Sequence, residues 1–371
     1  MCSEQRSSPP LNEMRSSSRS FSTAWSNGPI FGKAGKERRD KGSEPWLGEQ
    51  LRTAGAKLWV EGLCLVFLAA VAPLVGCKSP ADAMARAQAR RISSLQGTYG
   101  TYDAEPRRPD GRVDVERLVA ELVAIRANTY NFLVWRAASD WEDFKLFLPR
   151  ARAKGIRVWV TLVPPSESPP HTRQYSEPFR LDYQRWAVEI AKLSVQEPNL
   201  AAWSLDDFSY DSKTFTPEYM RQMIEASRRI NPRLAFVPCL YYDHITPQLA
   251  EKYRPFVDGI LFPYRHESGK RNLGQWDTLA SELARVRERF GSGVPVFVDV
   301  YATRHSQLKD STAEYVEQVM NIGRRTADGV LIFCHQCQDS SPEKYQVIKD
   351  LFNRWASEDA KHRLAGMGVR P

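Results

Sequence analysis

Two adjacent carboxylates, Asp206 and Asp207, follow an apolar run over residues 200–205. The preceding Glu197-Pro198-Asn199 breaks a helical pattern, so the run is predicted to be a strand that ends at the acid pair. Acids at the end of a buried strand are costly unless they face solvent, bind a cation or exchange protons. The pair is therefore a candidate for acid–base chemistry, with a helix cap and a solvated turn residue as the alternative.

A third carboxylate, Asp299, lies inside the apolar run over residues 294–301. In a strand, Phe297, Asp299 and Tyr301 share one face, and valines occupy the other. The valine face suits contact with helices, so Asp299 should point into the interior of a closed barrel. A carboxylate at such a position indicates function, with a buried ion pair to Arg265 as the alternative.

Eight apolar runs of strand length alternate with eight segments of helical periodicity after residue 97. The predicted strands span residues 98–103, 129–135, 156–163, 200–205, 234–242, 259–264, 294–301 and 329–334. The predicted helices span residues 113–127, 141–154, 181–196, 217–230, 247–256, 273–290, 312–325 and 342–355.

This alternation predicts an α/β fold. Near-continuous apolar strands suit a parallel sheet covered by helices. Eight strand–helix units in about 270 residues match the usual size of a (β/α)8 TIM barrel. A doubly wound open sheet is the alternative, but it requires a glycine-rich phosphate turn after an early strand, and the sequence has none.

Aromatic and polar residues gather at the predicted carboxyl ends of the strands, where TIM barrels place their active sites. Sugars present flat apolar faces to aromatic rings and hydroxyl groups to polar side chains. Glycosidic cleavage needs an acid for the leaving oxygen and usually a second carboxylate. The candidate substrate-binding residues are Tyr102, Trp135, Arg136, Tyr241, Tyr264, Arg265, His266, Tyr301, His335 and Gln336.

The segment Trp203-Ser-Leu-Asp-Asp-Phe208 resembles the glycoside hydrolase superfamily of TIM barrels. Its acid pair is similar to the adjacent acids of substrate-assisted β-N-acetylhexosaminidases. That resemblance implies that Asp206 orients and polarises an acetamido group and that Asp207 is the general acid. A second resemblance, to retaining barrels with an acid on strand four and a nucleophile on strand seven, implies that Asp299 is the nucleophile. The Asn-Glu pair usual in the second group is missing here.

An apolar run over residues 63–75 follows Lys57 and ends at Gly76-Cys77. The run is short for a membrane span, and its flanks are those of an export signal. Leu74-Val-Gly-Cys77 resembles the lipobox of bacterial lipoproteins, which implies a lipid on Cys77 that anchors the chain to a membrane. An incidental cysteine after a buried or lipid-lying helix is the alternative. Because residues 1–56 precede the signal, we expect either a true start near residue 58 or 60, or an uncleaved anchor.

The predicted organisation has five parts. Residues 1–56 are a disordered or wrongly assigned extension, 57–77 the lipoprotein signal segment, 78–96 a linker, 97–356 the catalytic barrel, and 357–371 a C-terminal tail. The net charge of +8 is interspersed and forms no basic stripe with aromatic residues, so no nucleic-acid partner is expected. Cys334-His-Gln-Cys337 lacks a second pair of ligands, so no metal and no cofactor are expected.

Together these features predict an exported glycoside hydrolase-like protein, lipid-anchored in the cell envelope on its periplasmic or extracellular face. It would act on a polysaccharide or glycoconjugate with Asp206, Asp207 and Asp299 as catalytic residues. A carbohydrate-binding barrel lipoprotein without catalysis is the main alternative. A metal-dependent hydrolase using His266, His335 and Asp299 is a third, although it lacks a closely spaced ligand pair.

Overall fold

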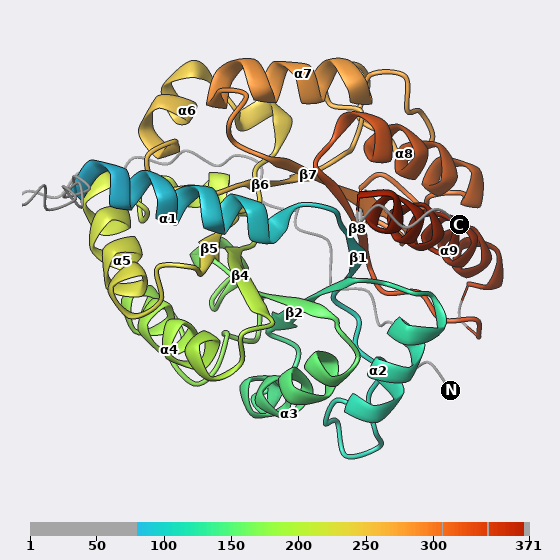
Figure 1. Ribbon diagram of the computed structural model, residues 1–371, viewed down its shortest axis with the longest axis horizontal. Helices are drawn as coiled ribbons and strands as arrows, with labels where there is room; N and C mark the ends of the chain where they lie inside the picture. The colour runs from blue at the N-terminus through green and yellow to red at the C-terminus, as the bar shows by residue number, and fades with distance from the viewer. Residues whose placement is uncertain (1–79, 306, 340, 367–371) are drawn as a thin grey trace, which may run out of the picture. The chain divides into compact units, whose positions relative to one another are not determined.

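The computed structural model describes residues 80–305, 307–339 and 341–366. In these ranges parallel strands alternate with helices around a barrel (Figure 1). The strands are β1 (Thr98–Tyr102), β2 (Thr129–Val134), β3 (Arg157–Leu162), β4 (Leu200–Leu205), β5 (Ala235–Phe236), β6 (Ile260–Pro263), β7 (Val296–Tyr301) and β8 (Gly329–Phe333). The predicted TIM-barrel fold is confirmed.

Neighbouring strands pair in the order β5-β4-β3-β2-β1-β8-β7-β6. The ring closes between the chain after β5 and β6, where Leu240 N donates to Leu261 O at 2.9 Å and Leu261 N donates to Pro238 O at 3.0 Å. β5 is shorter than the predicted 234–242 because Pro238 has no N–H to donate to a neighbouring strand. The carboxyl ends of all eight strands therefore meet at one rim.

Helices cover the outside of the sheet. They are α2 (Val115–Ala124), α3 (Asp140–Ala153), α4 (Tyr183–Gln196), α5 (Pro217–Ile230), α6 (Pro247–Tyr253), α7 (Leu279–Phe290), α8 (Ala313–Thr326) and α9 (Pro342–Gly366). Several start where a side-chain oxygen accepts a backbone N–H of the first turn, namely at Asp114, Asp182, Thr216, Thr246 and Thr312. No helix in the described ranges is long and apolar enough to cross a bilayer.

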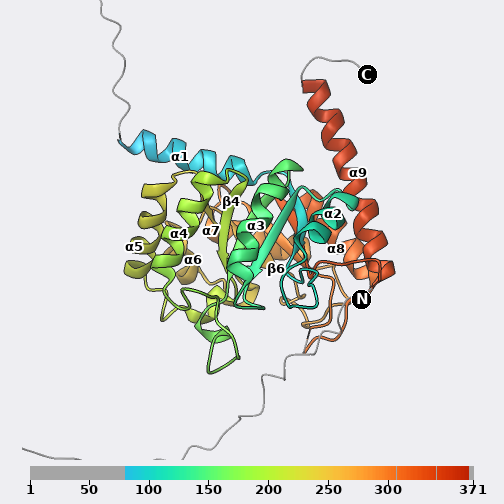
Figure 2. The ribbon, with the colours of Figure 1, turned by 90° about the horizontal axis from the view of Figure 1, so that it is seen from below.

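The segment predicted as a linker, residues 78–96, contains the helix α1 (Pro80–Leu95). Arg91 Nε donates to Asp258 Oδ1 at 2.8 Å, and Arg91 Nη1 donates to Pro232 O at 3.0 Å. These contacts place α1 near the amino ends of β5 and β6, which begin shortly after Pro232 and Asp258. Figure 2 shows α1 lying along one side of the barrel. The segment is rich in Ala and Arg and has a weak apolar period, which is why its pattern did not indicate a helix that packs.

Two further predictions concern the ends of the chain. The predicted boundary between barrel and tail, after residue 356, falls inside α9, which continues to Gly366. The predicted extension over residues 1–56, the signal segment and Cys77 lie outside the described residues.

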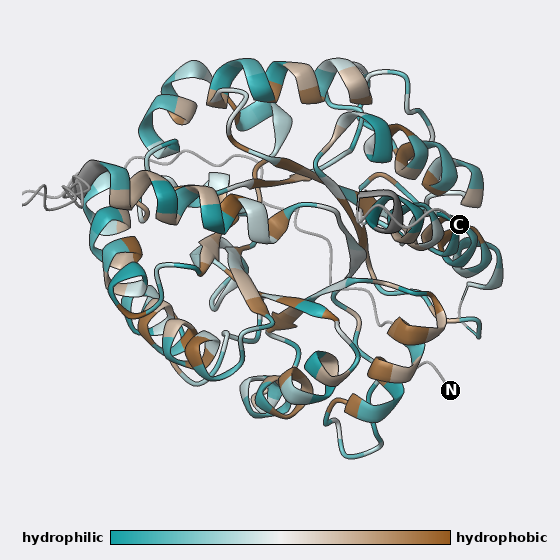
Figure 3. Ribbon diagram, viewed as in Figure 1, coloured by the Kyte–Doolittle hydropathy of each residue, from teal (hydrophilic) through white to brown (hydrophobic). Residues whose placement is uncertain are grey.

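The core has two layers. Inside the barrel, Tyr102, Leu133, Trp159, Phe297 and Leu331 belong to one buried cluster. A second cluster lies between the sheet and the helices and includes the β7 valines and Trp203. Figure 3 shows apolar residues on the strands and hydrophilic ones toward the outside of the helices. Alternate residues of each strand belong to the inner and the outer cluster, and this alternation decides which residue at a strand end faces the interior.

Candidate active site

Asp206 and Asp207 turn into the same space at the end of β4. Asp206 continues the inward alternation of Ala202 and Ser204, and its Oδ2 accepts the hydroxyl of Tyr102 at 3.0 Å. Asp207 would point outward in a continued strand, but it adopts a left-handed conformation with φ 42° and ψ 26°. Its carboxylate accepts the hydroxyl of Tyr241. Asp207 makes no side-chain cap on the following turn, so the alternative of a capping aspartate does not apply.

Burial controls the proton affinity of this pair. Burial and, next, the charge of Asp207 raise the pKa of Asp206 to about 7. Burial also raises the pKa of Asp207, opposed by the hydrogen bond from Tyr241 and the positive charge of Arg265. Two interacting carboxyls in one site lose their two protons in successive steps, and the pKa of each step belongs to the pair rather than to one residue. The arrangement can therefore hold one proton near neutral pH, as a general acid requires.

Asp299 lies on the interior face of β7, as its spacing predicts, and is only 3% exposed. Burial and the charges of Asp206 and Asp103 raise its pKa well above the usual range. The alternative of an ion pair with Arg265 is not formed, because Arg265 pairs with Glu267. The Oδ1 atom of Asp299 has no hydrogen-bond partner among the described residues. Asp299 is therefore a deeply buried acid whose surroundings favour its protonated form.

Arg265, Tyr241 and Tyr301 form one wall of the site. The Arg265 guanidinium lies 3.9 Å from the centroid of the Tyr241 ring, where a cation is attracted to the ring face. Burial raises the pKa of the Tyr301 hydroxyl well above its usual range, and Arg265 opposes that shift. The wall thus combines ring faces with hydrogen-bond donors beside Asp207.

Glu167 is a further acid that the sequence did not indicate. It lies in the 3₁₀ turn η1 (Pro165–Glu167) after β3. Burial, then Asp207 and Asp206, raise its pKa well above the usual range. Its position beside the pair depends on the conformation of a long loop, and its local sequence carries no strand or helix signal that would place it there.

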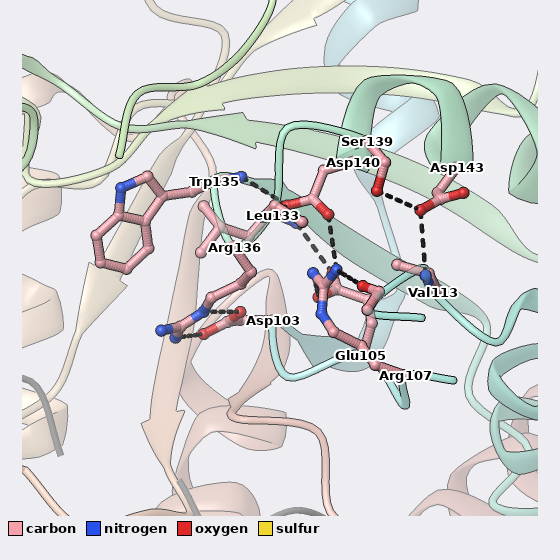
Figure 4. Close-up of polar contacts among 12 residues, drawn as sticks. Asp103, Glu105, Arg107, Val113, Leu133, Trp135, Arg136, Ser139, Asp140 and Asp143 are labelled. Atoms are coloured by element: carbon pink, nitrogen blue, oxygen red, sulfur yellow. Dashed lines mark hydrogen bonds and ion pairs between the residues drawn. The ribbon is translucent and has the colours of Figure 1, made fainter. Parts of the chain in front are cut away.

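Trp135 and Arg136 follow β2 and rest on a buried charged network (Figure 4). Arg136 Nη2 contacts Asp103 Oδ2 at 2.5 Å, and Asp103 is fully buried. Behind them, Asp140 Oδ2 accepts the backbone N–H groups of Trp135, at 3.1 Å, and Ala137, at 2.9 Å. Asp140 Oδ1 pairs with Arg107 at 2.9 Å. The network therefore fixes the backbone that carries Trp135 and Arg136.

Four of the predicted substrate-binding residues make their contacts with groups other than the acid pair. The Tyr264 ring stacks on Tyr315 in the helix layer. His266 has positive φ and contacts Asp277 at 3.0 Å in its own loop. His335 contacts Thr101 at 2.9 Å and Glu121 of α2 at 3.1 Å, outside the barrel. The side-chain amide of Gln336 donates to the backbone oxygen of Cys334 at 2.8 Å.

These positions follow from alternation and loop geometry. In a strand, the residue that follows an interior position faces the helices, which explains why Tyr264 lies in the helix layer. The two histidines lie apart from Asp299, so the metal hydrolase predicted from His266, His335 and Asp299 has no common site.

One group in the described part of the chain could hold a metal. The ligand atoms of Asp206, Asp207 and Cys239 lie within 4.8 Å of one another. Each carboxylate already accepts a tyrosine hydroxyl, and burial raises the pKa of the Cys239 thiol well above its usual range. A protonated thiol is a poor metal ligand. These donors therefore fit proton transfer better than a resident metal.

No family model matches the chain, and no curated protein sequence matches it. A glucosidase from Croceicoccus marinus aligns with a TM-score of 0.51 and 12% identity, over 71% of this chain and 68% of that one. A β-D-glucuronidase from Dictyoglomus thermophilum aligns with a TM-score of 0.46 and 15% identity, over 70% of this chain and 50% of that one. A tryptophan synthase from M. tuberculosis aligns with a TM-score of 0.45 and 13% identity, over 72% of this chain and 96% of that one.

This chain thus spans only half of the glucuronidase. Identities this low carry information about the fold and none about the reaction. The likeness to the glucosidase therefore concerns the fold alone.

Proposed function

We propose that this protein is a glycoside hydrolase that cleaves a saccharide by carboxylate acid–base catalysis. One observation carries the proposal: Asp206 and Asp207 share one space at the carboxyl rim, and burial raises the pKa of both. Tyr102 holds one acid and Tyr241 holds the other. Such a pair can keep one proton and one charge together at neutral pH, which is what cleavage of a glycosidic bond requires.

In the proposed reaction, Asp207 is the general acid and Asp206 the polarising carboxylate. A substrate acetamido N–H donates to Asp206, which favours the ionised form of Asp206 and leaves the proton of the pair on Asp207. The acetamido oxygen attacks the anomeric carbon as the glycosidic bond breaks, and Asp207 gives its proton to the departing oxygen. Water then attacks the anomeric carbon, the bond between that carbon and the acetamido oxygen breaks and restores the acetamido group, and the water gives a proton to Asp207. The products are a free sugar and an alcohol.

The burial of Asp299 supports this assignment over one with a nucleophile on β7. A nucleophilic carboxylate must be ionised and must reach the anomeric carbon. Asp299 is buried beneath the rim with a strongly raised pKa, so it suits the role of a neutral group under Asp206. We therefore propose that Asp299 stays protonated and so adds no second negative charge to the barrel interior near Asp206.

The surroundings of the pair support a carbohydrate substrate. Aromatic rings and guanidinium groups lie together near the rim, with Arg136 over one face of Trp135 and Arg265 over one face of Tyr241. This is the combination that sugar rings bind. We further propose that the chain is exported and lipid-anchored through Cys77, which rests on the signal-like segment of the sequence.

The direct experiment is to screen the full chain against aryl glycosides, including pairs that differ only in an N-acetyl or an N-trifluoroacetyl group. We expect turnover of an N-acetylated substrate and a much slower rate for its trifluoro partner, because fluorine makes the acetamido oxygen a weaker nucleophile. Equal rates would contradict the substrate-assisted step. Saccharide binding without turnover of any substrate would instead favour a non-catalytic carbohydrate-binding barrel.

A further inference from the structure

A hollow of about 340 Å³ opens beside Trp135, at the same rim as the acid pair. The loop between β3 and α4 forms its other side, and Arg173, Tyr175, Glu177 and Arg180 line it. Figure 4 shows the Trp135 ring pointing away from the buried network around Arg107 and Asp140, which leaves that ring outside the network. The residues that line the hollow do not include Asp206 or Asp207.

The loop that forms the hollow is fixed to the barrel by hydrogen bonds. Trp135 Nε1 donates to Gln174 O at 3.2 Å, and Val163 N donates to the Ser176 hydroxyl at 3.0 Å. Trp186 Nε1 of α4 donates to Arg180 O at 3.1 Å. These contacts tie both sides of the loop to β2, β3 and α4. The barrel and α4 thus fix the position of the loop that lines the hollow.

The charges in the hollow do not cancel. Arg180 pairs with Glu177 at 2.9 Å and lies 5.3 Å from the centroid of the Tyr175 ring. Arg136, on the neighbouring rim, is held by Asp103. Arg173 is exposed and has no ion-pair partner in the described part of the chain. One guanidinium therefore remains available to a ligand next to the half-buried rings of Trp135 and Tyr175.

Hydrogen bonds also connect the loop that lines the hollow to Glu167. The Thr172 hydroxyl bridges Glu167 O, at 2.6 Å, and Gln174 O, at 3.2 Å. Glu167 lies at the start of the same loop, and after burial the charges of Asp207 and Asp206 raise its pKa. The loop that lines the hollow thus also carries an acid that interacts with the charges of Asp206 and Asp207.

We propose that this hollow is an outer subsite for an acidic sugar unit, one that carries a carboxylate or a sulfate. Trp135 and Tyr175 each have one face covered by a guanidinium, of Arg136 and Arg180, so the sugar would contact the other face or the edge of these rings. Arg173 would bind the anionic group of the sugar through charge-assisted hydrogen bonds. This inference rests on the proposed function, since it names the class of substrate that the same rim accepts.

The test measures binding, which needs no turnover. Oligogalacturonate and its methyl ester form one matched pair of probes, and a sulfated galactan oligosaccharide and its desulfated form make the other. Calorimetric titration of the full chain at low salt should show tighter binding of the acidic member of at least one pair. The pair that shows this preference identifies carboxylate or sulfate as the anionic group.

Variants then locate the binding site. Arg173→Gln should weaken binding of the preferred acidic probe by about three- to five-fold, as expected for one partly exposed ion pair, and should leave its neutral partner unchanged. Trp135→Ala should weaken both members of the pair. Arg233→Gln is the matched control, because Arg233 is also exposed but precedes β5 at the opposite end of the barrel.

Two results would overturn the subsite. One is that neither acidic probe binds more tightly than its neutral partner. The other is that Arg173→Gln and Arg233→Gln weaken acidic binding equally, which would indicate a general charge effect. Either result leaves the hydrolase proposal to its own screen with aryl glycosides, so the two failures are distinguishable.

Discussion

At the scale of single residues, the site depends on where protons reside. Tyr102 and Tyr241 each donate a hydrogen bond to one acid, and such bonds favour the ionised form. Burial acts in the opposite direction and prevails at both acids. The pair consequently stays partly protonated at a pH where solvated aspartates are fully ionised.

This balance predicts a pH profile. Activity requires one proton on the pair, so kcat/KM should fall as pH rises through about 7, where the pair loses its last proton. Tyr241→Phe removes a bond that stabilises ionised Asp207, so the pKa should rise and the alkaline limb should move to higher pH. Tyr210→Phe is the control, because it changes a neighbouring ring without altering a bond to either acid. A shift to lower pH in Tyr241→Phe would contradict this account.

Asp299 gives a prediction for stability. Its pKa is raised in the folded chain, so the folded state binds a proton that the unfolded state releases above about pH 4. The resulting loss in the free energy of unfolding is absent below that pH and grows as the pH rises toward the pKa of Asp299 in the folded chain. Asp299→Asn removes this cost, so its Tm should exceed that of the natural chain by a few degrees at pH 8 and match it near pH 4. A lower Tm at pH 8 would show that Asp299 is stabilising as a carboxylate.

At the scale of elements, strands were predictable and loop conformations were not. Apolar runs marked all eight strands because each is buried on both faces. Alternation placed Asp299 inside the barrel but could not show the left-handed turn at Asp207, which depends on the chain beyond β4. Glu167 was missed for a similar reason, since its place beside the pair depends on the path of a long loop. Helix α1 was missed because contacts with Asp258 and Pro232, rather than its own periodicity, hold it.

The turn after β2 yields a prediction at this scale. Arg107 is the cation that neutralises buried Asp140, which in turn holds the backbone of Trp135. Arg107→Met should lower the free energy of unfolding by about 3 kcal/mol, because it leaves a buried carboxylate without its partner. The adjacent Arg108→Met should change it by less than about 0.5 kcal/mol, since Arg108 pairs with Asp110 in solvent. Urea unfolding measures the free energy of unfolding of both variants. Equal losses would show that the buried pair of Arg107 and Asp140 stabilises the fold no more than the exposed pair of Arg108 and Asp110.

At the scale of the whole molecule, closure of the barrel brings together residues from distant parts of the chain. Tyr102 of β1 and Tyr241 after β5 meet the acids of β4 because all the strands are parallel and end at one rim. The sequence could predict that all strands end at one rim, because eight alternating strand–helix units indicate a closed parallel barrel. Alternation turns Tyr264 toward the helices, whereas His335 lies beyond the end of β8, where alternation no longer places a side chain.

Anchoring is also a property of the whole molecule. If Cys77 carries a lipid, the full chain expressed in a bacterium should fractionate with membranes, and Cys77→Ser should move most of it to the soluble fraction. Cys64→Ser, within the apolar run of the same signal-like segment, should have no such effect. Membrane association that persists in Cys77→Ser would point to an uncleaved anchor instead.

The most direct test of the central claim is the dependence of Asp207→Asn on the leaving group. On a substrate whose leaving alcohol needs a proton, kcat should fall by about 100- to 10,000-fold. With a 2,4-dinitrophenyl leaving group, which departs without a proton, the loss should be far smaller, and circular dichroism should show an intact fold. Asp110→Asn, at an exposed position, is the control and should behave as the natural chain. Equal losses for both leaving groups, or full activity in Asp207→Asn, would contradict the assignment of Asp207 as the general acid.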